Sequence, residues 1–235
     1  MRPGLLFDLG GTLWDDWPAE LEYWRICTEL LSEAGHSCTV DDFIRDSAEL
    51  IRRYTPSLNR ALVWQHSGRD AALAARIREA ASQRIWDMLE DDDALARLYP
   101  LWPGIHDVLD ELAQAARLGV VSMHGSRVRG VMRRMGLMRH FEELALCDER
   151  GFHKPDPRII AWTLESMGLE ATDCVMIGDR IDNDVHPAKV LGLSAVWLKV
   201  HPYDIQEPRY EADLPDLTIT DMRELPAALR GGGWL

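Results

Sequence analysis

Gly4-Leu5-Leu6-Phe7-Asp8-Leu9-Gly10-Gly11-Thr12 is the stretch that decides the fold of this 235-residue chain. An apolar run that ends in a carboxylate and two glycines predicts a buried parallel strand opening into a tight loop. Ligands bind at the carboxyl ends of the strands in open α/β sheets. A carboxylate at that place is suited to act as a nucleophile or a cation ligand, and the two glycines let the backbone approach a bound group closely. Glycine pairs are common after strands, so a site also requires partners at the ends of later strands.

Later segments of the chain supply such partners. Each of the partner residues follows an apolar strand or lies in a loop that opens a helix: Ser122, Lys154, Asp179 and Asp184. Taken singly, each has a plain structural explanation as a turn, cap or loop residue. Taken together with Asp8, in this order and on these elements, they favour a site for phosphoryl chemistry.

This set of motifs resembles the haloacid dehalogenase superfamily, in the branch with a helical cap inserted after the first strand. The resemblance extends over nearly the whole chain and includes Pro103-Gly104, Gly136 to Phe141 and Asp216 to Pro226. It implies an α/β core with a Rossmann-like, doubly wound parallel sheet and an inserted all-helical cap domain. We expect the core domain to comprise residues 1–14 and 103–235, and the cap to comprise residues 15–102.

The pattern of apolar residues supports the same organisation. From Pro18 to about Leu98 the spacing predicts helices and no strand, with Thr39-Val40-Asp41-Asp42 as an N-terminal helix cap. We interpret the acidic run Glu90 to Asp93 as the solvated end of a helix. After Gly104 predicted helices and strands alternate, which indicates a parallel, doubly wound sheet.

The resemblance implies a magnesium site around the first strand. Asp8 would attack the phosphorus of a phosphate ester and form an aspartyl-phosphate that water then hydrolyses. Mg²⁺ prefers oxygen ligands in octahedral geometry. The Asp8 carboxylate, the Gly10 carbonyl oxygen and the Asp179 carboxylate would hold it, and Asp184 would orient water on the metal.

The remaining motif residues would bind the phosphate. Ser122 would donate its hydroxyl to a phosphate oxygen together with the backbone amide of Met123. Lys154 would neutralise both the phosphate and Asp8, and Thr12 would stabilise the loop. Phosphoryl transfer needs such positioning and charge neutralisation more than covalent assistance.

Gly10 departs from the family pattern, because the phosphatases of the family usually have a second aspartate there. That aspartate is the general acid, and positioned acid–base groups contribute about 10²–10⁴-fold to rate. Three interpretations stay open. In the first, the chain hydrolyses phosphates slowly, or with good leaving groups such as acyl phosphates, or with water or a substrate group supplying the proton. In the second, another residue (Asp15, Asp16 or His124) substitutes. In the third, the protein binds phosphates without turning them over.

Two related chemistries fit the sequence less well. Phosphonoacetaldehyde hydrolases also have a small residue at this position but use a cap lysine, and the only lysines here are Lys154, Lys189 and Lys199, none of them in the expected cap. Haloacid dehalogenases need no metal and usually have a bulky residue at the position of Gly10. The fourth motif, Gly178-Asp179-Arg180 with Asp184 beyond it, has the form of the metal-binding phosphatases.

The composition of the chain limits the classes of partner that we expect it to bind. A net charge of −13 argues against a nucleic-acid binder and against binding to an anionic membrane surface. Four cysteines without Cys-x-x-Cys spacing, and no signal-type or membrane-length apolar segment, indicate a reduced cytoplasmic protein. We therefore expect a Mg²⁺-dependent phosphatase of a small phosphorylated metabolite, monomeric or homodimeric. The alternative is a phosphate-binding or regulatory protein with weak or no turnover.

Overall fold

The computed structural model describes residues 2–235, and the chain divides into two compact units. One unit comprises the N-terminal segment up to Trp14 together with Leu101–Leu235, and the other comprises Asp15–Pro100. The boundary between Pro100 and Leu101 precedes the predicted one at residue 103.

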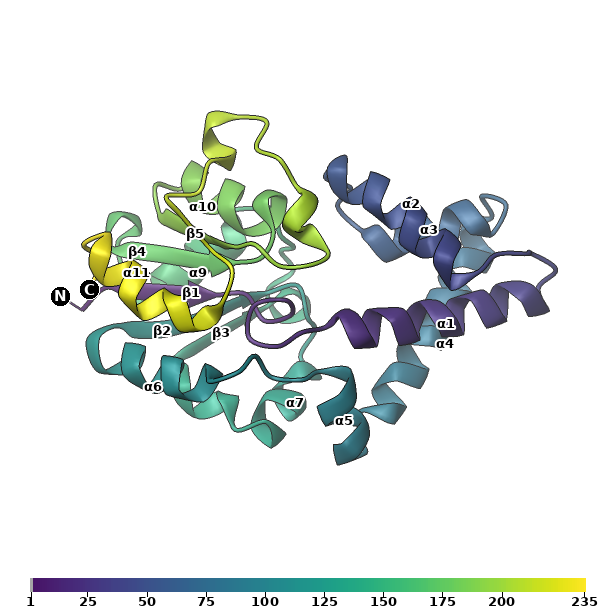
Figure 1. Cartoon of the computed structure of the whole chain (residues 1–235), viewed down its shortest axis with the longest axis horizontal. Coiled ribbons are helices and arrows are strands. Elements are labelled where there is room, and N and C mark those ends of the chain that lie inside the picture. The colour runs from purple at the N-terminus through teal and green to yellow at the C-terminus, as the bar shows by residue number, and fades with distance from the viewer. Residues whose placement is uncertain (1) are drawn as a thin grey trace. The chain divides into compact units, whose positions relative to one another are not determined.

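Within residues 2–235, the first unit contains a six-stranded sheet in which all the strands run parallel, in the order β3-β2-β1-β4-β5-β6 (Figure 1). The strands are β1 (Gly4–Phe7), β2 (Arg117–Ser122), β3 (Glu143–Leu146), β4 (Cys174–Gly178), β5 (Ser194–Leu198) and β6 (Leu217–Ile219). The predicted fold class is confirmed. The strand order reverses at β1, and in doubly wound folds such a switch point is where ligands bind.

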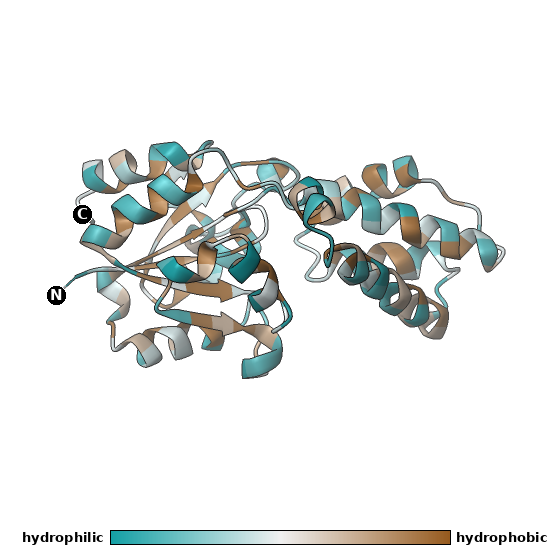
Figure 2. Ribbon diagram, turned by 90° about the horizontal axis from the view of Figure 1, so that it is seen from below, coloured by the Kyte–Doolittle hydropathy of each residue, from teal (hydrophilic) through white to brown (hydrophobic). Residues whose placement is uncertain are grey.

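Helices cover both faces of this sheet (Figure 2). The α-helices of the unit are α6 (Ile105–Ala115), α7 (Val128–Arg134), α8 (Cys147–Arg150), α9 (Arg158–Met167), α10 (His186–Val190) and α11 (Leu225–Gly231). One π-helical turn spans Ile181–Val185, and short 3₁₀ turns span Leu137–His140, Ala171–Asp173, Tyr203–Ile205, Glu211–Asp213 and Met222–Glu224. The strands are apolar along most of their length because both faces of the sheet are covered. Helix α6 shows the complementary pattern, burying Ile105, Val108, Leu109 and Leu112 along one face.

The regular structure of residues 15–100, all of which are described, is helical. The helices are α1 (Trp17–Glu33), α2 (Val40–Arg52), α3 (Leu58–His66), α4 (Ala71–Met88) and α5 (Asp92–Leu98). Helix α2 begins at the predicted cap: the Asp42 amide donates to Thr39 Oγ1 at 3.2 Å, and the Thr39 amide donates to Asp42 Oδ2 at 2.9 Å. This reciprocal pair satisfies two amides that a bare helix end would leave without partners.

The interpretation of the acidic run was wrong in one respect. Helix α4 ends at Met88, and the aspartates begin a new helix, α5, that the sequence analysis did not separate. Asp91 is its N-cap, because Asp91 Oδ1 accepts the Ala94 amide at 2.8 Å. Negative charge in the first turn also suits the helix dipole. Among residues 2–235, no helix combines the length and apolar character of a membrane span.

Candidate active site

The loop after β1 places Asp8 at the centre of the sheet edge. Phe7 pairs with Val120 of β2 on one side and with Ile177 of β4 on the other, so Asp8 lies between the ends of both neighbouring strands. Its amide donates to the Ile177 carbonyl at 2.9 Å. The chain then turns sharply, and the Trp102 indole N–H donates to the Gly11 carbonyl at 3.1 Å.

Gly11 is required by this turn for two reasons. Its φ is +73°, a conformation that residues with a side chain rarely adopt. A Cβ at this position would also lie only 2.3 Å from Asp179 Oδ2. The glycine therefore leaves the space that the Asp179 carboxylate occupies.

Three carboxylates meet beside this loop. Asp8, Asp179 and Asp184 are buried, and one ligand oxygen from each lies within 4.8 Å of the others. The chain reaches this arrangement through Gly178, where a Cβ would stand 2.3 Å from Asp184 Cγ. The Arg180 amide donates to Asp184 Oδ2 at 3.0 Å and thereby orients the carboxylate.

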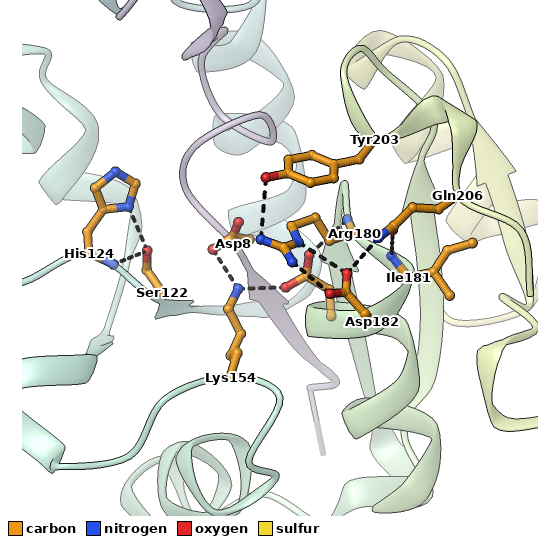
Figure 3. Close-up of polar contacts among 10 residues, drawn as sticks. Asp8, Ser122, His124, Lys154, Arg180, Ile181, Asp182, Tyr203 and Gln206 are labelled. Carbon is orange, nitrogen blue, oxygen red and sulfur yellow. Dashed lines mark hydrogen bonds and ion pairs between the residues drawn. The ribbon is translucent and has the colours of Figure 1, made fainter. Parts of the chain in front are cut away.

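Lys154 joins two of these carboxylates (Figure 3). Its Nζ donates to Asp8 Oδ1 at 2.7 Å and to Asp184 Oδ1 at 2.6 Å. Only 1% of the lysine side chain is exposed, so this is a buried ion pair, in which each charge depends on its partners.

Burial and neighbouring charges both shift the pKa values of Lys154 and Asp184. Burial alone would lower the pKa of Lys154, but the negative charges of Asp184 and Asp8 outweigh it, and the pKa is raised. Burial raises the pKa of Asp184 to about 6; the charge of Asp8 acts in the same direction, and Lys154 opposes it. The cluster therefore carries more negative charge than its one ammonium group neutralises.

Ser122 ends β2 and is fully buried. Its hydroxyl lies 3.0 Å from His124 Nδ1 and accepts the His124 amide at 3.2 Å. The indole of Trp14 contacts the imidazole edge-to-face, with ring centroids 5.8 Å apart. Burial lowers the pKa of His124, which favours the neutral imidazole.

The other predicted site residues occupy the surrounding loops. Thr12 is fully buried, and its hydroxyl has no hydrogen-bond partner among residues 2–235. Gly10 is buried in the loop between Asp8 and Gly11. The Met123 carbonyl accepts a hydrogen bond from the Cys147 thiol at 2.9 Å.

The two aspartates considered as substitutes for the missing acid belong to the other unit. Asp15 Oδ1 accepts the Trp17 amide at 3.0 Å, and Asp16 is the N-cap residue of α1. Asp15 thus has a structural role at the start of a helix.

Sequence reasoning missed a polar cluster beside the carboxylates. Arg180 forms a bidentate pair with Asp182, with Nη2 to Oδ2 at 2.6 Å and Nε to Oδ1 at 3.1 Å. Gln206 bridges the same segment: its amide donates to Asp182 Oδ1 at 2.8 Å, and its Oε1 accepts the Ile181 amide at 2.7 Å. The guanidinium also lies 4.5 Å from the centroid of the Tyr203 ring (Figure 3). Arg180 and Asp182 stand within the fourth motif, but nothing in the sequence marks Gln206 or Tyr203.

The donor set fits a hard divalent cation. The three carboxylates offer oxygen ligands only, which suits Mg²⁺ better than a metal that prefers sulfur or nitrogen. Their excess negative charge is a further reason to expect a cation there. The geometry can therefore combine a nucleophilic carboxylate, a cation and an ammonium group at one edge of the sheet.

A Rossmann-like sheet with this cluster at its switch point is the arrangement of a hydrolase of the haloacid dehalogenase type. The family model described as haloacid dehalogenase-like hydrolase matches residues 3–192. The chain belongs to this family.

Curated relatives and solved structures agree with this assignment. The chain is 27% identical to the glyceraldehyde 3-phosphate phosphatase of Methanopyrus kandleri over 98% of each chain. It is 30% identical to the phosphoserine phosphatase of Thermus thermophilus over 74% of this chain and 70% of the relative. It shares its fold with a HAD phosphatase from Thermococcus onnurineus (TM-score 0.67, 24% identity, 97% and 98% coverage). It also shares its fold with a 2-haloacid dehalogenase from Pseudomonas syringae (TM-score 0.61, 22% identity, 99% and 100% coverage).

Proposed function

We propose that this chain is a Mg²⁺-dependent phosphatase that acts on a small phosphorylated metabolite through an aspartyl-phosphate on Asp8. The observation that carries the proposal is the position of Lys154, whose ammonium group lies 2.7 Å from Asp8 and 2.6 Å from Asp184. A protein that only binds phosphate does not need a nucleophile, such as a buried carboxylate held beside a lysine ammonium group. The phosphatase names of the curated relatives point in the same direction.

The placement of the residues supports the following roles in this proposal. An oxygen of Asp8 attacks phosphorus, the bond from phosphorus to the leaving oxygen breaks, and water then hydrolyses the aspartyl-phosphate. Lys154 neutralises charge on Asp8 and on the phosphate, while Ser122 and the Met123 amide bind phosphate oxygens. The Thr12 hydroxyl, which has no hydrogen-bond partner among residues 2–235, would stabilise the loop in the bound state.

The metal would be held by Asp8, Asp179 and the Gly10 carbonyl oxygen, with Asp184 as an outer carboxylate. When bound, Mg²⁺ would supply positive charge that stabilises the phosphoryl group during transfer. The buried all-oxygen cluster supports this assignment.

The missing acid sets the substrate preference that we expect. Gly10 has no side chain, Asp15 binds a helix amide, and the lowered pKa of His124 makes its imidazole a poor proton donor at neutral pH. We therefore expect the leaving group to depart without strong protonation. Acyl and aryl phosphates meet this demand better than alkyl phosphates. The conjugate acids of their leaving groups are stronger acids than alcohols, so these groups can depart as anions.

The alternative function is phosphate binding with weak or no turnover, and Gly10 is the feature that favours it. A Mg²⁺-dependent phosphate-release assay distinguishes the two functions. Acetyl phosphate and para-nitrophenyl phosphate would be compared with sugar and nucleotide phosphates, with the Asp8→Asn variant as the blank. We expect release that requires Asp8 and Mg²⁺ and is fastest for the first two substrates. Undiminished release by Asp8→Asn would refute the nucleophile, and absence of release with retained phosphate binding would favour the alternative.

A further inference from the structure

A pocket lies within the helical unit, between α3 and α4. Its volume is about 420 Å³, within the range of small-molecule sites. All of its lining residues belong to Asp15–Pro100: Thr55, Pro56, Ser57, Arg60, Ala61, Trp64, Ala71, Ala74, Ala75 and Arg78. The pocket is therefore a property of this unit alone, and it is separate from the carboxylate cluster.

The helical repeat explains how the pocket forms. Positions 57, 60, 61 and 64 of one helix region, and 71, 74, 75 and 78 of the other, follow the spacing of a single helix face. Alanines occupy half of these positions, so the two faces leave space where larger side chains would interlock. A short connection, residues 67–70, joins the helices and makes them antiparallel neighbours. Arg60 and Arg78 therefore lie towards one end of the pocket, and Trp64 lies towards the other.

A buried guanidinium nitrogen without a partner among the described residues, Nε of Arg78, distinguishes this pocket from an ordinary packing defect. Some arginines of the same unit pair with carboxylates, such as Arg45 with Asp42 and Arg25 with Glu22, whereas others, such as Arg84, form no ion pair among residues 2–235. Within residues 2–235 neither Arg60 nor Arg78 forms an ion pair, although the chain carries a net charge of −13. The Nε–H of Arg78 is buried and has no acceptor in the described part of the chain. A buried donor left without a partner costs about 1–3 kcal/mol, which favours an acceptor from a ligand.

The opposite end is formed by an indole and alanines, and the Arg69 guanidinium lies 5.8 Å from the centroid of the Trp64 ring. The Trp64 side chain is 43% exposed, unusual for a large aromatic residue in a small helical unit. The methyl groups of Ala71 and Ala74 continue the apolar wall. An indole face beside alanines suits a planar hydrocarbon body, which would gain both burial and stacking.

We propose that this pocket binds a small organic anion with a planar apolar body, of the aromatic carboxylate class. The carboxylate accepts hydrogen bonds from Arg78 and Arg60, and the ring system lies against Trp64 between the alanines. The site is distinct from the candidate active site, and the proposal does not depend on the chemistry at Asp8. It gives the helical unit a ligand-binding role of its own.

Isothermal titration calorimetry of the full chain with 2-naphthoate tests the proposal. We expect saturable one-site binding, weakened at least tenfold by Arg78→Met and by Ala75→Trp, which fills the pocket but retains both guanidinium groups. Arg84→Met is the matched control, because Arg84 is exposed on the same helix outside the pocket; it should bind like the unaltered chain. The neutral amide, 2-naphthamide, should bind at least tenfold more weakly than the carboxylate.

Two results would overturn the proposal: no binding of 2-naphthoate to the unaltered chain, or equal affinity in the Ala75→Trp variant. If Arg78→Met fails to fold, Ala75→Trp and the amide comparison still decide the question. Binding at the carboxylate cluster would be insensitive to both pocket variants, and it would therefore count against the proposal.

Discussion

Replacing Lys154 by Met tests whether the ammonium group holds the carboxylate cluster together. Met keeps an apolar stem of similar length and removes only the charge and its hydrogen bonds. The oxygens of Asp8 and Asp184 lie within 4.8 Å of each other, so at an effective dielectric constant of about 20 their bare charges repel by about 3–4 kcal/mol. Removing one partner of a buried pair costs about 3–5 kcal/mol. We therefore expect the free energy of unfolding to fall by about 3 kcal/mol or more at pH 7 in the presence of a chelator.

Urea unfolding, followed by circular dichroism with EDTA and with excess Mg²⁺, measures this loss. The metal should recover more stability in Lys154→Met than in the unaltered chain, because it would replace the missing positive charge. Turnover should fall by about 10²–10³-fold in Mg²⁺, as when a group that stabilises the transition-state charge is removed. Lys189→Met is the control: Lys189 pairs with Asp216 at the surface, where 25% and 30% of the two side chains are exposed, and such pairs contribute about 0–1 kcal/mol.

Equal stability of the Lys154→Met and Lys189→Met variants in EDTA would refute this reasoning. It would mean that the carboxylates do not depend on Lys154 for neutralisation. A stability loss that Mg²⁺ fails to recover would instead contradict the placement of the cation among these carboxylates.

Three further substitutions probe separate features. Gly10→Asp should raise turnover of alkyl phosphates by about 10²-fold or more relative to para-nitrophenyl phosphate, because it restores the general acid; an unchanged ratio of kcat values would show that the proton already has another source. Gly178→Ala should destabilise the core by about 1–3 kcal/mol and weaken Mg²⁺ binding, because its Cβ would meet Asp184 Cγ at 2.3 Å. An unchanged Mg²⁺ affinity, measured by calorimetric titration, would contradict this prediction. Thr39→Ala should lower the free energy of unfolding by about 1 kcal/mol through loss of the α2 cap. An unchanged Tm in thermal unfolding would contradict a stabilising role for this cap.

Much of the fold could be predicted because its signals are local. The apolar strand that ends in Asp8 is one such signal, and the capping box at Thr39 is another. Each depends on residues adjacent in sequence, and the structure places both where the pattern predicts. The acidic run at 90–93 misled us because an aspartate suits both the solvated end of one helix and the start of the next.

The candidate site was predictable in its residue types but not in its contacts. Asp8, Ser122, Lys154, Asp179 and Asp184 are recognisable because each follows a strand or opens a helix. The contacts among these residues could not be predicted in the same way. The bridge from Lys154 to both Asp8 and Asp184 joins residues 146 and 30 positions apart, and no local pattern encodes such a distance.

The sequence by itself therefore determined the class of protein, the parallel sheet and the residues that could carry phosphoryl chemistry. Only the tertiary structure decided the pairing of Lys154, the association of Ser122 with His124, the support that Gln206 gives to Asp182, and the pocket between α3 and α4. The physical reason is that strand and helix patterns depend on the period of one segment. Ion pairs, burial and cavities depend on which segments the sheet order brings together. No single segment of the sequence encodes the order β3-β2-β1-β4-β5-β6.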